Sequence, residues 1–531
     1  MSLLRATFTV SGLTLVSRVL GFVRDILMAS VLGAGWIADC FVLAFKLPNL
    51  FRRLFAEGAF NAAFVPLFSG YLEGAGSAGE TDEAARRAAA RRFAEEALSA
   101  LFAILLLFVA ACQAVMPWLM MGIGMGFVGE PEKFDLAVEL TRITFPYLLF
   151  ISLVSLMGGV LNSLGRFAAV AATPVLLNLS LIGAMVLFAN ATRTPAHALS
   201  WGVSVAGVIQ FLWLFVACWR EGMPLRLRWP RLTPDVRKLI TLMLPVALGA
   251  GAYQISLLID VFLASFLADG SLAFLYYADR LNQLPLGVIG IAVGTALLPA
   301  LSRQVAAADR NGALASQNRA IEMALFLTLP AAAALVVVPG PVIGVLFERN
   351  AFDSAMTAAT AAALGAYALG LPAYVLAKVL GPGFFARKDT ATPVRYSLIA
   401  LGVNVVLNVI LMIPLAHVGL ALATAISAWV NAALLYHGLV KRDCLKSDDR
   451  LKRRLVRTLA AVALMVGVIW GGRALLEPYF SATTPEKVLA LVVLVAAGLL
   501  SYGVAAFALG AVRRDDFTGL RRRNNKTVGP A

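Results

Sequence analysis

Long apolar runs separated by short polar connections make up most of this chain. A helix needs about 20 mostly apolar residues to cross the hydrocarbon core of a bilayer. On this basis the 531-residue sequence predicts an all-α, polytopic membrane protein with fourteen spans. The predicted spans cover 8–30, 36–68, 93–120, 136–162, 168–190, 197–219, 238–267, 271–301, 318–338, 355–384, 394–415, 418–440, 456–476 and 486–510.

Composition supports this class and excludes others. The chain is 60% hydrophobic and 14% charged, outside the range of soluble globular domains. Its four cysteines form no CxxC pair, so neither a disulfide framework nor a zinc site is expected. No cleavable signal peptide is expected, because Arg18, Arg24 and Asp25 interrupt the first apolar run.

The basic residues sort by side of the membrane. Of 45 Lys and Arg, 32 lie on one side of the predicted spans and five on the other. Basic residues concentrate in cytoplasmic connections, so both termini are predicted to be cytoplasmic. This distribution also argues that the net charge of +15 serves membrane topology, and no nucleic-acid partner is expected. The remaining eight, inside predicted spans, are Arg18, Arg24, Lys46, Arg52, Arg53, Arg142, Arg280 and Lys378.

A weak internal repeat predicts two lobes. Ala38-Asp39 recurs as Ala268-Asp269, and the sequence Ala-Thr-Pro-Val at 172–175 recurs at 391–394. These matches pair spans 1–6 with spans 7–12 in a parallel repeat, an arrangement typical of transporters that bind substrate between repeats. The predicted domains are an N-lobe at 1–225, a C-lobe at 226–445, spans 13 and 14 at 446–510, and a cytoplasmic tail at 511–531.

Arginines inside predicted spans are the main indication of function. Placing a guanidinium at the centre of a span costs roughly 2.5–3.5 kcal/mol on insertion scales, so such residues face water or a partner charge. Arg18, Arg24, Arg52 and Arg280 therefore predict a wet, cationic chamber that binds an anion. The planar fork of Arg suits phosphate and carboxylate groups. Structural alternatives are that Arg24 and Asp25 reach a membrane interface, or that Arg280 pairs with its own neighbouring acid.

The second span carries a further polar stripe. Asp39, Lys46 and Arg53 are spaced by seven residues, and Glu57 follows four residues after Arg53. Asp39, Arg53 and Glu57 are candidate substrate-binding residues, although a stripe of alternating sign can also be paired within itself. Pro48 leaves the phase of the stripe across it undetermined.

A second polar set is separate from the arginines. It consists of Asp260, Asn404, Asn408 and Thr424, which offer oxygen ligands inside predicted spans. Hard cations take such ligands, so a sodium or proton site coupled to transport is one hypothesis. Hydrogen bonding between helices is the other.

The sequence contains no motif for covalent chemistry. It has no Gly-Lys dipeptide and hence no phosphate-binding P-loop, and no nucleophile–base pair or metal-ligand cluster stands out. A transporter without an organic cofactor is predicted.

Three segments resemble a known family. They are Ser17–Asp25 (SRVLGFVRD), Phe45–Phe60 (FKLPNLFRRLFAEGAF) and Tyr276–Leu281 (YYADRL). They are similar to the MurJ (MviN) lipid II flippases of the multidrug/oligosaccharidyl-lipid/polysaccharide exporter superfamily, and the resemblance extends over the whole chain. It implies that Arg18, Arg24, Arg52 and Arg280 bind substrate, and that spans 13 and 14 help to form a groove for a lipid tail.

The resemblance also implies a biological role. Such a protein moves lipid II, the undecaprenyl-pyrophosphate-linked peptidoglycan precursor, from the inner to the outer leaflet of the bacterial cytoplasmic membrane by alternating access. It would contribute to cell-wall synthesis and cell shape, with cell-wall synthesis or division proteins as partners.

Other functions remain as alternatives. They are a flippase for another polyprenyl-linked glycan, a sodium/drug antiporter, a polyprenyl-donor glycosyltransferase, and a scaffold that does not transport. A drug antiporter needs an acidic cavity, whereas this one is basic. A glycosyltransferase needs a catalytic acid or base, and the longest extracytoplasmic connection predicted, about 339–354, offers only Glu348 and Asp353.

Overall fold

The computed structural model describes residues 3–53, 60–74, 82–480 and 482–512. In these ranges all regular secondary structure is helical, apart from one isolated β-bridge between Arg349 and Phe352. The all-α prediction is confirmed. The chain divides into two compact units, Met1–Ala273 with Arg349–Phe352, and Phe274–Glu348 with Asp353–Ala531.

The described residues of the first unit form eleven α-helices, one 3₁₀ turn and the start of α12. They are α1 (Leu3–Leu32), α2 (Trp36–Arg52), α3 (Asn61–Glu73), α4 (Glu83–Ala114), α5 (Met116–Ile123), η2 (Met125–Phe127), α6 (Pro131–Thr144), α7 (Tyr147–Ser163), α8 (Phe167–Ala171), α9 (Thr173–Phe188), α10 (Pro195–Arg220) and α11 (Pro234–Ser265).

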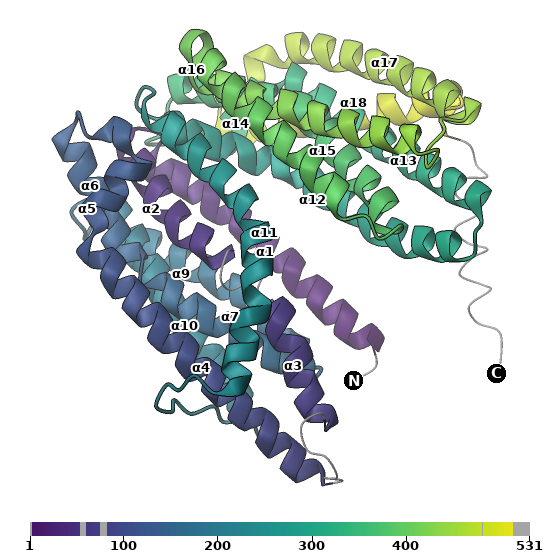
Figure 1. The fold of residues 1–531 in the computed structure, drawn as a ribbon. Helices are drawn as coiled ribbons and strands as arrows, with labels where there is room; N and C mark the ends of the chain where they lie inside the picture. Colours follow the sequence, from purple (N-terminus) through teal and green to yellow (C-terminus); the bar gives the residue numbers. More distant parts are fainter. Residues whose placement is uncertain (1–2, 54–59, 75–81, 481, 513–531) are drawn as a thin grey trace. The chain divides into compact units, whose positions relative to one another are not determined.

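The second unit contains most of α12 and the six helices that follow. They are α12 (Ser271–Ala306), α13 (Arg310–Val337), α14 (Pro339–Phe347), α15 (Ser354–Phe385), α16 (Ala391–Lys441), α17 (Asp449–Phe480) and α18 (Thr484–Ala508). Helices α17 and α18, which hold the last two predicted spans, pack side by side (Figure 1).

Several predicted spans are divided in the structure. The predicted span 136–162 consists of α6 and α7, which meet at Phe145–Pro146. Conversely, the predicted spans 394–415 and 418–440 both lie in α16, which folds back at Ala416. Nine helical segments of the described residues are long and apolar enough to cross a bilayer, and the total of fourteen spans stays a prediction.

Aromatic residues spaced by one helical turn hold α3 against α4. Phe60, Phe64 and Phe68 stack with ring centroids 5.1 and 5.5 Å apart, and Phe93 of α4 stacks on Phe64 at 5.5 Å. Because residues at i and i+4 share one helix face, this spacing gives α3 a continuous aromatic edge. The four rings are buried and form part of the core of the first unit.

The boundary between units lies later than the predicted lobe boundary at 225. Helix α11 packs on α3, α4, α5 and η2 and therefore belongs to the first unit. Upstream of it, the connection after α10 is fixed to α4. The buried Glu95 carboxylate accepts hydrogen bonds from the backbone N–H of Arg226 and from the Arg228 side chain. The predicted lobes are defined by the sequence repeat, whereas the two units are defined by packing. The packing therefore does not test the lobes, which stay a prediction.

Candidate functional site

Helix α1 carries two of the predicted arginines in different environments. Arg18 is exposed, whereas Arg24 and Asp25 are buried, at 7% and 4% exposure. The six-residue separation places Arg18 and Arg24 on different faces of the helix. Only Arg24 faces α9 and the rest of the bundle.

The Arg24 guanidinium is held by two side chains. Its Nε and Nη2 atoms donate to Oδ1 of Asp25, at 3.0 and 2.7 Å. Its Nη1 atom donates to Oδ1 of Asn178 at 3.0 Å. Asn178 in turn donates through Nδ2 to the Ser17 carbonyl at 2.9 Å. Gly21 lies opposite the Asn178 amide, and a Cβ there would be in ordinary van der Waals contact with it, at 3.5 Å. Arg24 is therefore charge-compensated and fixed in orientation.

Helix α2 places its polar residues at different depths of burial. Asp39 is buried, Lys46 and Arg52 are half-buried, and Arg53 is exposed just beyond the last helical turn. Arg52 lies in the last turn, where a cation interacts favourably with the helix dipole. Glu57 lies outside the described residues.

Asp39 has backbone partners within the first unit. Its carboxylate oxygens accept hydrogen bonds from the N–H groups of Gly270, at 2.7 Å, and Ala273, at 2.8 Å. A carboxylate in this position satisfies backbone donors at a helix N-terminus. Next to it, the buried ammonium of Lys133 pairs with Asp269. These contacts fix α2 and α6 to the start of α12.

Arg280 lies in the part of α12 that belongs to the second unit. Its side chain is half-buried, and its guanidinium carbon lies 4.8 Å from the centre of the Tyr276 ring. Its Nη2 atom donates a hydrogen bond to the Tyr276 hydroxyl at 3.3 Å. A cation over an aromatic ring is stabilised by the ring quadrupole. The neighbouring Asp279 accepts a hydrogen bond from Gln283. Since Arg280 and the other three arginines belong to different units, their convergence stays a prediction.

The second polar set is partly assembled in the structure. Asn408 donates to Asn404 Oδ1 at 3.1 Å, and Asn404 donates to Thr424 Oγ1 at 3.4 Å. The second of these bonds connects the two arms of α16. Asp260 lies in α11 of the first unit, half-buried. Among the residues that the structure describes, no group of three or more His, Cys, Asp or Glu side chains is arranged to hold a metal ion.

Comparison with known proteins decides the family. A sequence profile of the lipid II flippase MurJ family matches residues 28–490. The chain belongs to this family. It is therefore a multi-pass transporter of the inner membrane, not an enzyme, and the resemblance recognised from its motifs is confirmed.

Individual relatives agree with this assignment. A probable lipid II flippase MurJ from Rhizobium tropici is 44% identical over 100% of this chain and 98% of the relative. A solved structure of lipid II flippase MurJ in an inward closed conformation matches with a TM-score of 0.76 at 24% identity, covering 94% of this chain and 99% of that one. An inward-facing multidrug resistance MATE transporter of the MOP superfamily matches with a TM-score of 0.63 at 16% identity, covering 82% and 96%. The two solved structures establish the fold of this chain.

Sequence reasoning missed the side chains that hold the charged groups of this flippase in place. Asn178 is the partner of Arg24, and Lys133, which lies between the predicted spans 93–120 and 136–162, pairs with Asp269. One signal was present for Asn178, because it is a strongly polar residue in the apolar helix α9, and intramembrane Asn commonly bonds across helices. Nothing in the local sequence pairs Lys133 with Asp269, which is 136 residues away.

Proposed function

We propose that this flippase binds the anionic head group of lipid II through Arg18, Arg24, Arg52 and Arg280 and carries it to the outer leaflet by alternating access. Lipid II presents a pyrophosphate and peptide carboxylates, which hydrocarbon excludes. Guanidinium groups bind such oxygens through charge-assisted, often bidentate hydrogen bonds. The polyprenyl tail remains in lipid throughout.

The observation that carries this proposal is the exposure of Arg18. It lies in the middle of the predicted span 8–30, yet its side chain is exposed on α1. An exposed guanidinium at that depth needs water and an anion. Arg24, six residues further along α1, is held by Asp25 and Asn178 in a fixed orientation. The exposed Arg18 and the fixed Arg24 lie on the same helix. This combination suits a substrate that must be bound and later released.

The test is transport by variants of the full chain in proteoliposomes that contain lipid II. Arg18→Ala and Arg280→Ala are expected to reach the membrane folded and to flip lipid II at least tenfold more slowly, since a charge-assisted hydrogen bond contributes about 1.5–3 kcal/mol. Arg18→Lys retains the charge without the fork and is expected to be intermediate. Arg473→Ala, an exposed arginine at the end of α17, is the matched control. Normal flipping by both alanine variants would refute the proposal.

We also propose that a monovalent cation or the membrane potential resets the empty carrier. Asn404, Asn408, Thr424 and Asp260 are the candidate cation ligands. The potential supplies about 2.3 kcal/mol per charge per 100 mV. In the same proteoliposomes, an inward sodium gradient should accelerate flipping by the wild type and not by Asp260→Asn. A rate that follows only the imposed potential would assign the coupling to the potential and leave the cation site without a role.

The remaining proposals concern topology and partners. Both termini are proposed to be cytoplasmic, from the distribution of basic residues. Proteins of cell-wall synthesis and division are proposed as partners, because the transported precursor is their substrate. Co-purification of such proteins with the full chain after cross-linking in cells would support the partnership.

A further inference from the structure

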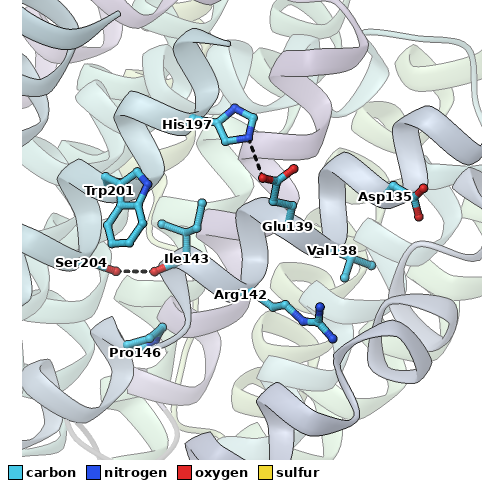
Figure 2. A pocket seen from close by; sticks show the side chains of 9 residues that line it. All are labelled: Asp135, Val138, Glu139, Arg142, Ile143, Pro146, His197, Trp201 and Ser204. Carbon is cyan, nitrogen blue, oxygen red and sulfur yellow. Dashed lines mark hydrogen bonds and ion pairs between the residues drawn. The ribbon is translucent and has the colours of Figure 1, made fainter. Parts of the chain in front are cut away.

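A groove with charged and aromatic walls lies between α6 and α10 in the first unit. It has a volume of about 670 Å³, within the range of about 300–1,000 Å³ typical of small-molecule sites. Figure 2 shows its lining. The side chains used below are Asp135, Glu139 and Arg142 from α6, and His197, Trp201 and Ser204 from α10. None of them belongs to the substrate site proposed above.

Asp135 and Arg142 form a pair of opposite charges without protein partners. They are seven residues apart, share one face of α6, and are both exposed (Figure 2). Neither side chain makes a hydrogen bond or an ion pair within the described part of the chain. Arg142 lies near the start of the predicted span 136–162, where an exposed guanidinium is stabilised by water or by an anion from outside the protein.

Glu139 lies between them along α6 and is fixed in place. Its carboxylate accepts a hydrogen bond from Arg193 at 3.4 Å and lies 3.3 Å from Nε2 of His197. These contacts hold Glu139 at the rim of the groove and away from Arg142, its i+3 neighbour. Below the rim, Ser204 donates to the Ile143 carbonyl and ties α10 to α6 (Figure 2).

The α10 wall continues as an apolar strip. Trp201 is 57% exposed, and Val205, Val208 and Leu212 follow on the same helix face at 49%, 37% and 52% exposure. Trp side chains are enriched where membrane meets water, and an exposed aliphatic strip below one is in contact with acyl chains. The groove therefore opens to lipid, with its charged end at the depth of the head groups.

We propose that this groove binds a bilayer phospholipid with a zwitterionic amine head group, of the phosphatidylethanolamine class. Arg142 binds the phosphate, and the carboxylates of Asp135 and Glu139 bind the ammonium. The acyl chains lie along Trp201 and the apolar strip of α10. Glu139 is already paired with Arg193. The charged groove side chains without protein partners are therefore one carboxylate, Asp135, and one guanidinium, Arg142, a combination that complements a zwitterion better than an anionic lipid. Along the axis of α6, Glu139 lies about 4.5 Å from Arg142, so both side chains belong to the charged end of the groove.

The experiment is native mass spectrometry of the full chain extracted from bilayers with equal amounts of phosphatidylethanolamine and phosphatidylglycerol. The wild type is expected to retain phosphatidylethanolamine preferentially. Arg142→Gln should reduce that retention about tenfold, because it removes one charge-assisted contact. Asp135→Asn combined with Glu139→Gln should remove the preference between the two lipids while some phospholipid stays bound. Arg473→Gln, an exposed arginine on another helix, should behave as the wild type.

Other outcomes would overturn the proposal. Unchanged retention in Arg142→Gln, with thermal unfolding like that of the wild type, would show that Arg142 binds no phosphate. Equal retention of both lipids by the wild type would exclude amine recognition. Displacement of the bound phospholipid by added lipid II, abolished in Arg142→Gln, would assign the groove to the transport substrate. A cross-linked dimer through Trp201→Cys would assign it to a second copy of the chain.

Discussion

At the scale of single residues, buried charge in this flippase is compensated locally. Arg24 and Asp25 are adjacent in sequence and form an ion pair of 2.7 Å with side chains 8% and 6% exposed. Asn178 supplies a neutral acceptor from another helix. An ion pair out of water is favourable only when its geometry and hydrogen bonds offset the loss of hydration. The arginine is thus held by a framework specific to this fold.

Removing Asp25 alone should destabilise the protein more than removing Arg24 and Asp25 together. We expect Asp25→Ala to lower the free energy of unfolding by about 3–5 kcal/mol, because it leaves a buried guanidinium without its counter-charge. The double variant Arg24→Ala/Asp25→Ala should be less destabilised than Asp25→Ala alone. Thermal unfolding in detergent measures both, with Leu179→Ala, at an exposed position of α9, as the control. Additive losses in the double variant would contradict a coupled pair.

At the scale of elements, α16 shows how one helix becomes two arms. Pro414 removes a backbone donor, and Ala416 has φ 48° and ψ −130°, outside the helical region. Just beyond the bend the backbone approaches itself closely. A Cβ on Gly419 would lie 2.2 Å from the Leu411 carbonyl oxygen. This glycine is therefore required by contact between the two arms, and the bend depends on it.

Two glycines in α16 should respond to substitution in opposite ways. Gly419→Ala is expected to destabilise the protein by about 1–3 kcal/mol, because the added methyl group overlaps backbone atoms. Gly402→Ala, in the same helix with nothing within 4 Å of the added Cβ, should be neutral or stabilising by up to about 1 kcal/mol. Thermal unfolding of the two variants side by side makes the comparison. Equal effects would show that the bend tolerates a side chain.

The two ends of α16 are held together outside the membrane. Arg442 donates to the Asp389 carboxylate and, at 2.8 Å, to Thr392 Oγ1, while Asp389 accepts from the Thr392 N–H at 2.9 Å. The first unit has a comparable clasp, in which Arg166 pairs with Glu221 at 2.8 Å across the helices from α8 to α10. The two clasps lie at matching places in the predicted repeat, with the positions of acid and base exchanged.

The α16 clasp should lose its charge contribution in acid. The hydrogen bond from Arg442, and then that from the Thr392 N–H, hold the pKa of Asp389 well below its ordinary value of 3.8. A depressed pKa stabilises the fold above the unfolded-state value and stops doing so as the pH falls through the folded-state value. Asp389→Asn keeps an acceptor for the Thr392 N–H and removes the charge. The melting temperature of this variant should lie below that of the wild type by a constant amount from about pH 8 to 5. The difference should shrink below about pH 4. A loss unchanged at pH 3 would contradict this account.

At the scale of the whole molecule, basic residues fix orientation and apolar surface fixes location. Helices α10, α17 and α18 expose large apolar side chains along their length, among them Trp213, Trp470 and Leu499 at 45%, 70% and 68%. In water such surfaces would aggregate, and in a bilayer they contact acyl chains. Orientation then follows from which connections carry Lys and Arg.

The proposed orientation can be tested with reporters. A fluorescent protein fused to the C-terminus should fold and fluoresce, because it stays in the cytoplasm, whereas alkaline phosphatase in the same place should be inactive. Alkaline phosphatase inserted in the connection after α9, at Asn190–Thr194, should be active. The opposite pattern at either position would reverse the topology.

The sequence by itself determined the class and the family of this protein. Those depend on hydropathy summed over about 20 residues and on contiguous motifs, which are local properties. The tertiary structure alone decided that Asn178 holds Arg24, that Asp39 bonds the first turn of α12, that Lys133 pairs with Asp269, and that Arg142 lines a groove with Trp201. These contacts join residues tens to hundreds of positions apart. They depend on which helix faces meet, and an apolar helix that can pack through any of its faces does not encode that choice locally.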